Sequence, residues 1–404
     1  MKKIIYSIIP FLFLFVSCDD GSESFIRVPI TDDEEEPEVV DHKERGYEMY
    51  DLVKTNFQTK DGSNLFKENS PAQAGDQPYS YLWPYDAAVS GAAVLTELGC
   101  DVDYKAMVNN FEKYFRLGAE GNSIGGYGSS TNGTIGGGTR FYDDNSIVGI
   151  NLIDAYRITG DEVYLERAQR IVGFLKSGMD NVLGGALWWN ESEKNIAGNP
   201  NSNKPTCSNG YATQFLLRYY EIAKDPAEKK EVLDMAKDVY TWLRENLYDS
   251  YTKCYWNDKN ILGEINKTTW TYNTGVMIQN GVVLYRITGE SKYLEEAKIS
   301  ADGSYDYFVK VRNGVLSYPE HDPWFSTKLL GAYIDLNPYH ESTDKYINTF
   351  NDFANYGYGN ARTSTNLFYE DWTGINEGRY YSLLMQSCVV ETYGLLALYY
   401  SNKE

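Results

Sequence analysis

From residue 42 onward, apolar residues recur every three to four positions in one segment after another. That spacing puts them on one face of an α-helix, and few segments show the period of two that a strand requires. The pattern predicts helices over the ranges 42–56, 84–98, 103–116, 143–159, 161–178, 206–223, 226–247, 272–288, 290–310, 323–336, 342–357 and 379–401. We therefore expect an all-α protein, with short β-hairpins only in loops such as those around Trp188 and Tyr255.

The predicted helices come in pairs, and the pairs resemble one another. The segments 142–165 and 272–294 share the order Tyr, then Tyr-Arg-Ile-Thr-Gly and an acid, then Tyr-Leu. In both, the glycine (Gly160 or Gly289) follows the last apolar residue, where it is expected to end the helix. Looser copies begin at Trp83 and Thr206. A periodic series of helical hairpins predicts a repeat architecture.

Six helical hairpins can close into an (α/α)₆ barrel, and an open solenoid is the competing architecture. The first helix of each pair is richer in Gly, Ala and Val, so we expect it to line the inside. Its polar N-terminal residues would then gather at one mouth. Long loops rich in Gly, Asn and Trp recur at the same end of the hairpins, which favours the barrel.

The N-terminus has the order of an export signal. Met1-Lys2-Lys3 is basic, and Ile4 to Val16 is apolar but short for a membrane span. The following Ser17-Cys18 resembles a bacterial lipobox, and the next two acids resemble the surface-export signal of Bacteroidetes lipoproteins. The resemblance implies cleavage before Cys18 and lipidation of its thiol, with a conventional secretory peptide as the alternative. We predict an outer-membrane lipoprotein exposed at the cell surface.

The chain is expected to divide into a signal peptide (1–17), a lipidated cysteine with a flexible tether (18–41) and one barrel domain (42–404). Residues 19–41 hold ten acids and one base, and they carry little that could be buried. The net charge of the whole chain is −20, which argues against a nucleic-acid partner. The predicted membrane contact is through the lipid alone, and outer-membrane glycan-uptake proteins are possible partners.

Few residues suit a metal centre. Cys100, Cys207, Cys254 and Cys388 lie far apart without Cys-x-x-Cys spacing, so we expect buried free thiols. The three histidines are scattered as well. The sequence predicts neither a metal nor a cofactor.

Asp143 and Asp144 stand side by side where a glycine-rich segment meets a predicted helix. Adjacent residues entering a helix project about 100° apart, so the two carboxyl groups can flank a substrate from two directions. A separation of about 5–6 Å suits a retaining glycosidase, in which one acid attacks and the other donates a proton. Two acids so close also split their pKa values. A plain helix cap, with Asp143 as the capping residue, and a dinuclear metal site are the alternatives.

The surrounding motifs extend this interpretation. Tyr142-Asp143-Asp144-Asn145 is followed in order by Gly184-Gly185…Trp188-Trp189, Ser208-Asn209, Tyr272-Asn273-Thr274-Gly275, Phe325-Ser326-Thr327-Lys328 and Asp371-Trp372. The ordered set resembles glycoside hydrolase family 76, the bacterial endo-α-1,6-mannanases and their fungal relatives. The resemblance implies an (α/α)₆ barrel, a retaining endo-acting mechanism, Asp143 as nucleophile and Asp144 as acid/base. The chain departs from the family pattern at Ser146-Ile147-Val148 and at Thr274, and we expect these departures to change the substrate subsites.

Further polar and aromatic residues are predicted to contact the substrate because they flank the acids or begin the repeated helices. We align Tyr272 and Asn273 with Tyr142 and Asp143, so their polar groups should reach the same mouth. The predicted substrate-binding residues are Tyr142, Asn145, Tyr272, Asn273, Asn209, Trp188, Trp189, Trp83 and Asp86.

The expected function is cleavage of α-1,6-mannosidic linkages inside mannan through a covalent glycosyl-enzyme. A surface glycan-binding lipoprotein on the same barrel, with weak or no catalysis, is the alternative. A helical scaffold without a cleft at Asp143 is a third possibility.

Overall fold

The computed structural model describes residues 40–118, 123–319, 323–376, 378 and 380–403. Asp41–Glu404 form one compact unit. The predicted signal peptide, Cys18 and all but the last two residues of the tether lie outside the described residues. No described helix is long and apolar enough to cross a membrane.

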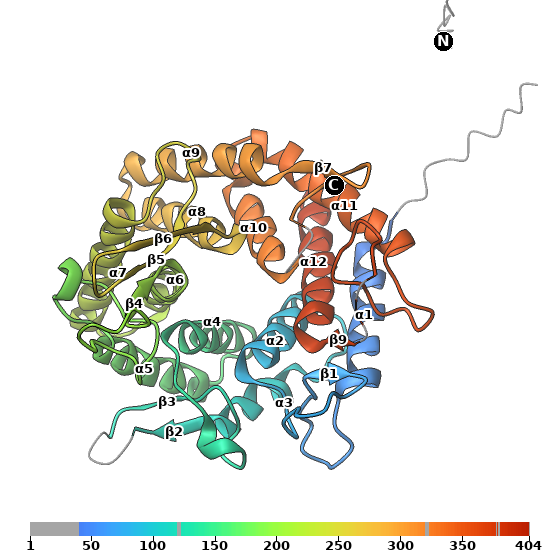
Figure 1. Ribbon diagram of the computed structural model, residues 1–404, viewed down its shortest axis with the longest axis horizontal. Helices are drawn as coiled ribbons and strands as arrows, with labels where there is room; N and C mark the ends of the chain where they lie inside the picture. Colours follow the sequence, from blue (N-terminus) through green and yellow to red (C-terminus); the bar gives the residue numbers. More distant parts are fainter. Residues whose placement is uncertain (1–39, 119–122, 320–322, 377, 379, 404) are drawn as a thin grey trace, which may run out of the picture. The chain divides into compact units, whose positions relative to one another are not determined.

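Six helices form a closed inner ring, in which each packs against the next and the last packs against the first (Figure 1). The closed ring confirms the predicted (α/α)₆ barrel and excludes the open solenoid. Inner helices are covered on nearly all sides, and in one of them every residue from Thr206 to Leu217 is buried. In ring order they are α2 (Leu82–Glu97), α4 (Tyr142–Thr159), α6 (Thr206–Ile222), α8 (Thr271–Thr288), α10 (Pro323–Leu336) and α12 (Leu383–Ser401).

The outer helices each cover one inner helix and expose one polar face. In α7, the buried residues Val232, Met235, Ala236, Val239 and Leu243 recur at helical spacing, as expected for a helix with one face in the core. The outer helices are α1 (His42–Phe57), α3 (Tyr104–Asn109), α5 (Glu162–Ser177), α7 (Pro226–Asn246), α9 (Ser291–Phe308) and α11 (Ser342–Asn360).

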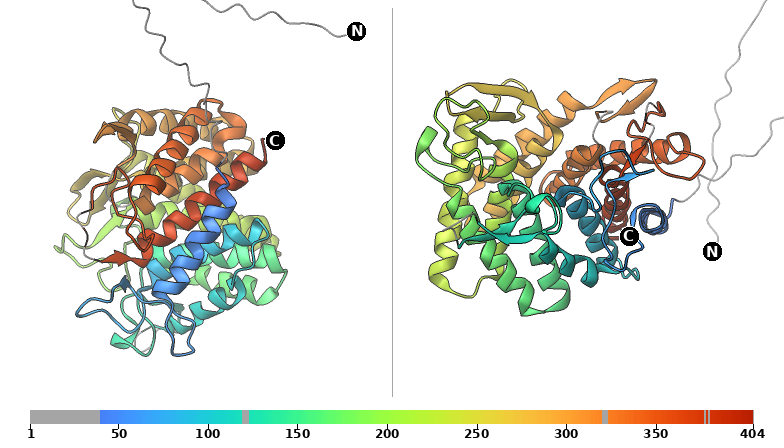
Figure 2. Two further views of the ribbon diagram at one scale, coloured as in Figure 1. Left: turned by 90° about the vertical axis from the view of Figure 1, so that its right-hand side faces the viewer. Right: turned by 60° about the horizontal axis from the view of Figure 1, so that its bottom comes forward.

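The sixth pair joins the two ends of the barrel domain. Helix α1 packs along α12, and Figure 2 shows the two side by side. The His42 ring stacks on Tyr400 with 5.0 Å between ring centroids. The other five pairs follow one another along the chain, so only this pair depends on a contact between distant segments. The inner ring itself closes where α12 packs against α2.

Two glycines end inner helices as predicted. Gly160 after α4 and Gly289 after α8 adopt the left-handed conformation, with φ of 70° and 74°, and each donates its N–H to the helix. A residue with a Cβ atom is strained in this conformation, so glycine is favoured there. Asp161 then caps α5 by accepting the N–H of Val163.

Two predicted helices are shorter than expected because strand pairing takes over part of each. The range predicted as 103–116 holds α3, a 3₁₀ turn and the start of β2, which pairs with β3. The helix predicted from 379 begins at Leu383, because Tyr381 and Ser382 pair with Asn69 and Ser70.

The strands are short, lie in the loops and often lead directly into inner helices. β4 precedes α6, β6 precedes α8 and β9 precedes α12, so small antiparallel sheets fix where those helices start. The strands are β1 (Asn69–Ser70), β2 (Phe115–Leu117), β3 (Gly125–Tyr127), β4 (Asn203–Pro205), β5 (Trp256–Asn260), β6 (Ile265–Thr269), β7 (Lys310–Arg312), β8 (Val315–Ser317) and β9 (Tyr381–Ser382).

Candidate active site

The N-terminal turns of all six inner helices meet at one cavity of about 710 Å³. Each helix contributes its second residue to the lining: Trp83, Asp143, Cys207, Tyr272, Trp324 and Leu384. The first residue of each of these helices is buried. Helix phase therefore decides which side chains reach the cavity, because successive residues turn by about 100°.

Aromatic rings make up a large part of the cavity wall. Trp189, Trp270 and Tyr81 keep 38%, 39% and 41% of their surface exposed at this site. The Tyr272 ring stacks on Phe325 at a centroid distance of 4.0 Å, and Trp270 packs edge-on against the same Phe325 ring at 5.4 Å. A concave aromatic site with a few charged groups is suited to binding the apolar faces of sugar rings.

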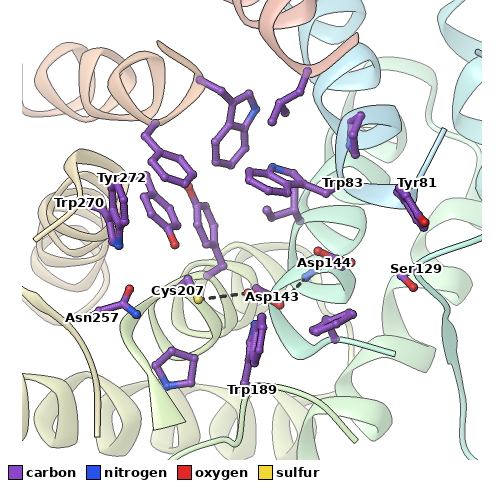
Figure 3. A pocket seen from close by; sticks show the side chains of 18 of the residues that line it. Tyr81, Trp83, Ser129, Asp143, Asp144, Trp189, Cys207, Asn257, Trp270 and Tyr272 are labelled. Atoms are coloured by element: carbon purple, nitrogen blue, oxygen red, sulfur yellow. Dashed lines mark hydrogen bonds between the residues drawn. The ribbon is translucent and has the colours of Figure 1, made fainter. Parts of the chain in front are cut away.

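Asp143 and Asp144 lie in the first turn of α4 and line this cavity (Figure 3). The residue at the capping position is Phe141, so the alternative in which Asp143 caps the helix is wrong. One carboxylate oxygen of Asp143 accepts the N–H of Asp144 at 3.1 Å. The other accepts the thiol of Cys207 on α6, also at 3.1 Å.

The two acids have different surroundings, and this separates their protonation states. Burial raises the pKa of Asp143, but hydrogen bonds from Cys207, from the backbone N–H groups of Asp144 and Asp143, and from Trp189 oppose the rise. Burial and then the charge of Asp143 raise the pKa of Asp144 well above its usual value, and no hydrogen bond from a described residue offsets that rise. The arrangement favours an ionised Asp143 beside a protonated Asp144.

A third acid, Asp86, is fully buried and does not line the cavity. Asn151 donates to one of its oxygens at 3.0 Å, and the other has no hydrogen-bond partner among the described residues. Burial, and then the charge of Asp144, raise the pKa of Asp86 well above its usual value. Its predicted contact with substrate is not supported, since the side chain does not reach the cavity.

The structure corrects the repeat alignment by one residue. Helices α4 and α8 both have 18 residues, and both end one residue before their left-handed glycine. Their second residues, Asp143 and Tyr272, are therefore equivalent, and so are Asp144 and Asn273. The predicted match of Tyr272 with Tyr142 was therefore wrong by one residue, because Tyr272 is the second residue of its helix and Tyr142 is the first.

Asn145 and Asn209 hold loops instead of facing the cavity. Each is the fourth residue of its inner helix, and each is fully buried. The Asn145 amide pairs with the backbone N–H and C=O of Tyr127, at 2.7 and 2.8 Å. Asn209 does the same with Leu187, at 2.7 and 2.9 Å. Their amides are occupied by these loops, and neither residue lines the cavity.

Gln386, the fourth residue of α12, likewise accepts from the backbone N–H of Phe368 at 2.9 Å and donates to its C=O at 3.0 Å. The fourth residue of α8, Thr274, makes a single such bond to the N–H of Tyr255 at 3.2 Å. The fourth position of these inner helices thus fixes the incoming loops that surround the cavity.

Trp188 and Trp189 point in opposite directions, as neighbours in an extended segment do. Trp189 lines the cavity and bonds to Asp143. The Trp188 indole is buried, donates to Asp180 at 2.6 Å and packs against the Lys204 ammonium. Only one of the two predicted tryptophans can therefore contact a ligand.

Two further predicted residues are buried away from the cavity. The Tyr142 ring stacks on Phe174 at 4.8 Å. The Asn273 side chain is fully buried and contacts Asn257, which does line the cavity. Of the predicted site residues, the structure brings five together at the cavity: Asp143, Asp144, Tyr272, Trp189 and Trp83.

Sequence reasoning missed Cys207 and Trp270. Both occupy positions that the repeat could have indicated, since Cys207 is equivalent to Asp143 and Trp270 precedes α8 as Phe141 precedes α4. All four residues line the cavity. Among the described residues there is no group of three or more His, Cys, Asp or Glu side chains that could hold a metal ion.

Comparison with known sequences decides the family. The sequence profile described as glycosyl hydrolase family 76 matches residues 48–372, which includes both acids and the starts of five inner helices. The chain belongs to glycosyl hydrolase family 76. The protein is therefore a member of a glycoside hydrolase family, and the cavity with its two acids is the candidate active site for that chemistry.

Solved structures of family 76 members have the same fold. The α-mannanase BT2949 of Bacteroides thetaiotaomicron is 24% identical with a TM-score of 0.75, and the match covers 90% of this chain and 97% of that one. The α-1,6-mannanase GH76A of Salegentibacter sp. HEL1_6 is 25% identical with a TM-score of 0.69, covering 89% and 100%. The latter was solved as an inactive variant, with two consecutive aspartates replaced by asparagine, in complex with α-1,6-mannotriose.

A family 76 mannosidase, Bt3792 of Bacteroides thetaiotaomicron, is 22% identical with a TM-score of 0.78, covering 90% of this chain and 100% of that one. A search of curated protein sequences finds no match.

Proposed function

We propose that this protein is a retaining, endo-acting α-1,6-mannanase. The observation that carries the proposal is the adjacent pair Asp143 and Asp144 in an aromatic cavity, with unlike surroundings that keep one acid ionised and the other protonated. The Salegentibacter α-1,6-mannanase, inactive when two consecutive aspartates are replaced, supports the substrate class. A cavity built from all six inner helices also has room for several sugar units.

In the first step, the ionised carboxylate of Asp143 attacks the anomeric carbon of a mannosyl unit. The glycosidic C–O bond breaks, and the departing oxygen takes the proton of Asp144. The product chain leaves with a new hydroxyl group, and a mannosyl ester of Asp143 remains. Asp144 is now ionised.

In the second step, Asp144 removes a proton from water as the water oxygen attacks the same carbon from the opposite face. The ester bond breaks, Asp143 recovers its charge and Asp144 recovers its proton. Two displacements at one carbon return the original α configuration. The rise in the pKa of Asp144 serves the first step, because the acid must still hold a proton near neutral pH.

The direct test is incubation with unbranched α-1,6-mannan, with products followed by chromatography and the first-formed anomer by NMR. We expect a ladder of oligosaccharides whose new reducing ends are initially α. An initial β anomer would contradict the retaining mechanism, and release of mannose alone would contradict endo action. Binding of the polymer without any bond cleavage would favour the glycan-binding alternative.

We further propose that Cys18 carries a lipid and holds the enzyme at the outer surface of the outer membrane. The proposal is supported by the Ser17-Cys18 sequence and the apolar segment before it. Metabolic labelling with a clickable fatty acid should mark the wild type but not Cys18→Ala. Protease added to intact cells should remove the protein, and protection from the protease would contradict surface exposure.

A further inference from the structure

Three side chains form a continuous row on neighbouring inner helices. Asp143, Cys207 and Tyr272 are each the second residue of their helix, on α4, α6 and α8 in turn. Because these helices are adjacent in the ring, their second residues are adjacent around the cavity (Figure 3). The Cys207 sulfur lies 3.1 Å from the Oδ2 atom of Asp143. The Tyr272 side chain lines the cavity on the next helix, and its interaction with the thiol lowers the pKa of Cys207.

The direction of these hydrogen bonds follows from the proton each group holds. The bond between Tyr272 and Cys207 lowers the pKa of the thiol and raises that of the phenol, as expected when the hydroxyl donates to sulfur. Burial raises the pKa of both groups well above their usual values, so both are neutral near pH 7. The thiol hydrogen is then free to point at the only charged member of the row, Asp143.

We propose that Cys207, supported by Tyr272, is a positioning residue for the nucleophile Asp143. The proposal rests on the proposed function in so far as Asp143 attacks the sugar. The thiol stabilises the ionised carboxylate and fixes the orientation of its two oxygens, since the other oxygen is held by the N–H of Asp144. The Tyr272 hydroxyl keeps the thiol turned so that its hydrogen faces Asp143.

A thiol suits this role because it is a weak hydrogen-bond donor. The negative charge on Asp143 disappears when the mannosyl ester forms, so any donor that stabilises the charge also opposes the attack. A thiol orients the carboxylate while opposing attack less than a hydroxyl or an amide would. It does not compete as a nucleophile, because burial and the charge of Asp143 keep it protonated.

Cys254 provides the internal contrast. It is also a buried free cysteine, but its sulfur donates to the backbone carbonyl of Thr252 at 3.5 Å and does not line the cavity. A buried thiol away from the cavity is therefore available in the same chain as a matched control.

The decisive measurement is the titration of the Asp143 carboxyl group by infrared difference spectroscopy of ¹³C-aspartate-labelled protein, with Asp143→Asn used to assign the band. Loss of a donor to the carboxylate favours its protonated form, so the pKa of Asp143 should rise by about one unit in Cys207→Ala. Cys207→Ser supplies a hydroxyl donor and should return the pKa to the wild-type value or below. Cys254→Ala should leave the band unchanged.

Tyr272→Phe tests the support from the second hydroxyl. It should shift the Asp143 titration in the same direction by less, and the double variant Cys207→Ala/Tyr272→Phe should titrate as Cys207→Ala does. Equal titration curves in wild type and Cys207→Ala would overturn the proposal. If the pKa shifts of the two single variants add up in the double variant, Tyr272 does not act through Cys207. Because the spectrum needs no turnover, this result is independent of whether the protein cleaves mannan.

On unbranched α-1,6-mannan, the acidic limb of the pH profile of kcat/KM should move to higher pH in Cys207→Ala, together with the pKa of Asp143. The value of kcat/KM below that limb should fall by about tenfold, and Cys207→Ser should restore it. A lower Tm with an unmoved limb in Cys207→Ala would mean that the thiol only packs. Absence of cleavage by the wild type would reject the proposed function while leaving the carboxyl titration to decide the role of Cys207.

Discussion

Helices α4 and α8 are two copies of one structural unit with different chemistry at their N-terminal turns. They have the same length, the same glycine at the end and an aromatic residue before the start, Phe141 or Trp270. At the second position α4 has an acid where α8 has Tyr272, and at the third it has Asp144 where α8 has the buried Asn273. The scaffold thus offers equivalent positions around the ring, and only α4 fills two of them with acids.

The largest effect is expected when the α4 turn loses its nucleophile. Asp143→Asn keeps the shape of the side chain but removes the charge, so turnover on α-1,6-mannan should fall by about 10⁴-fold or more. The circular dichroism spectrum and Tm should stay close to wild type. With azide added, Asp143→Ala should form a glycosyl azide of inverted configuration, because azide replaces the carboxylate in a single displacement. Near-normal cleavage by Asp143→Asn would show that Asp143 is not the nucleophile.

Replacing the second acid makes the third position of α4 identical to that of α8. Asp144→Asn removes the proton donor, so kcat on mannan should fall by about 10²- to 10⁴-fold. With an aryl mannoside that has a good leaving group, the rate of the glycosylation step in Asp144→Asn should fall much less, because that group departs without a proton.

The pH dependence sharpens the same test. The pKa of Asp144 is raised, so the wild type holds its catalytic proton at low pH and loses it as the pH rises through that pKa. Activity should therefore decline on the alkaline side, and Asp144→Asn should lose this limb. An alkaline limb that persists in Asp144→Asn would show that another group supplies the proton.

The fourth residues of α4 and α8 differ in the number of hydrogen bonds that they make to neighbouring loops. Asn145 makes three hydrogen bonds to the backbone, two with Tyr127 and one with Phe141, whereas Thr274 makes one to Tyr255. Asn145→Thr leaves buried backbone groups of Tyr127 without partners and should lower the free energy of unfolding by about 3 kcal/mol. Thr274→Ala should cost about 1 kcal/mol. Urea unfolding of both variants measures the difference, and equal losses would contradict the stronger clamp at α4.

The smallest effect is expected at the aromatic residue that precedes α8. Trp270 keeps 39% of its surface exposed at the cavity, so it can cover a sugar face without touching the reacting bond. Trp270→Ala should raise KM by about five- to tenfold and leave kcat nearly unchanged. Tyr251→Ala is the matched control, because this ring is 91% exposed and does not line the cavity. A fall in kcat with unchanged KM would place Trp270 in the chemical step.

Local sequence determined the helices and most of their ends. The apolar spacing fixes the amphipathic outer helices, and Gly160 and Gly289 end α4 and α8 because few other residues tolerate a left-handed backbone. The repeated hairpins were sufficient to predict the barrel, and the ordered motifs around Asp143 and Asp144 were sufficient to predict the family. These features depend on neighbouring residues or on the order of motifs along the chain, and a single sequence displays both.

Tertiary structure decided which polar residues face the cavity. A shift of one residue turns a helical side chain by about 100°. Aligning Tyr272 with Tyr142 therefore matched a residue that lines the cavity with one that is buried away from it. Asn145 and Asn209 were predicted to bind substrate, but their amides are taken by loops that come close only in the folded ring. The thiol of Cys207 reaches Asp143 for the same reason. Contacts between neighbouring inner helices, far apart along the chain, set the environment of the two acids.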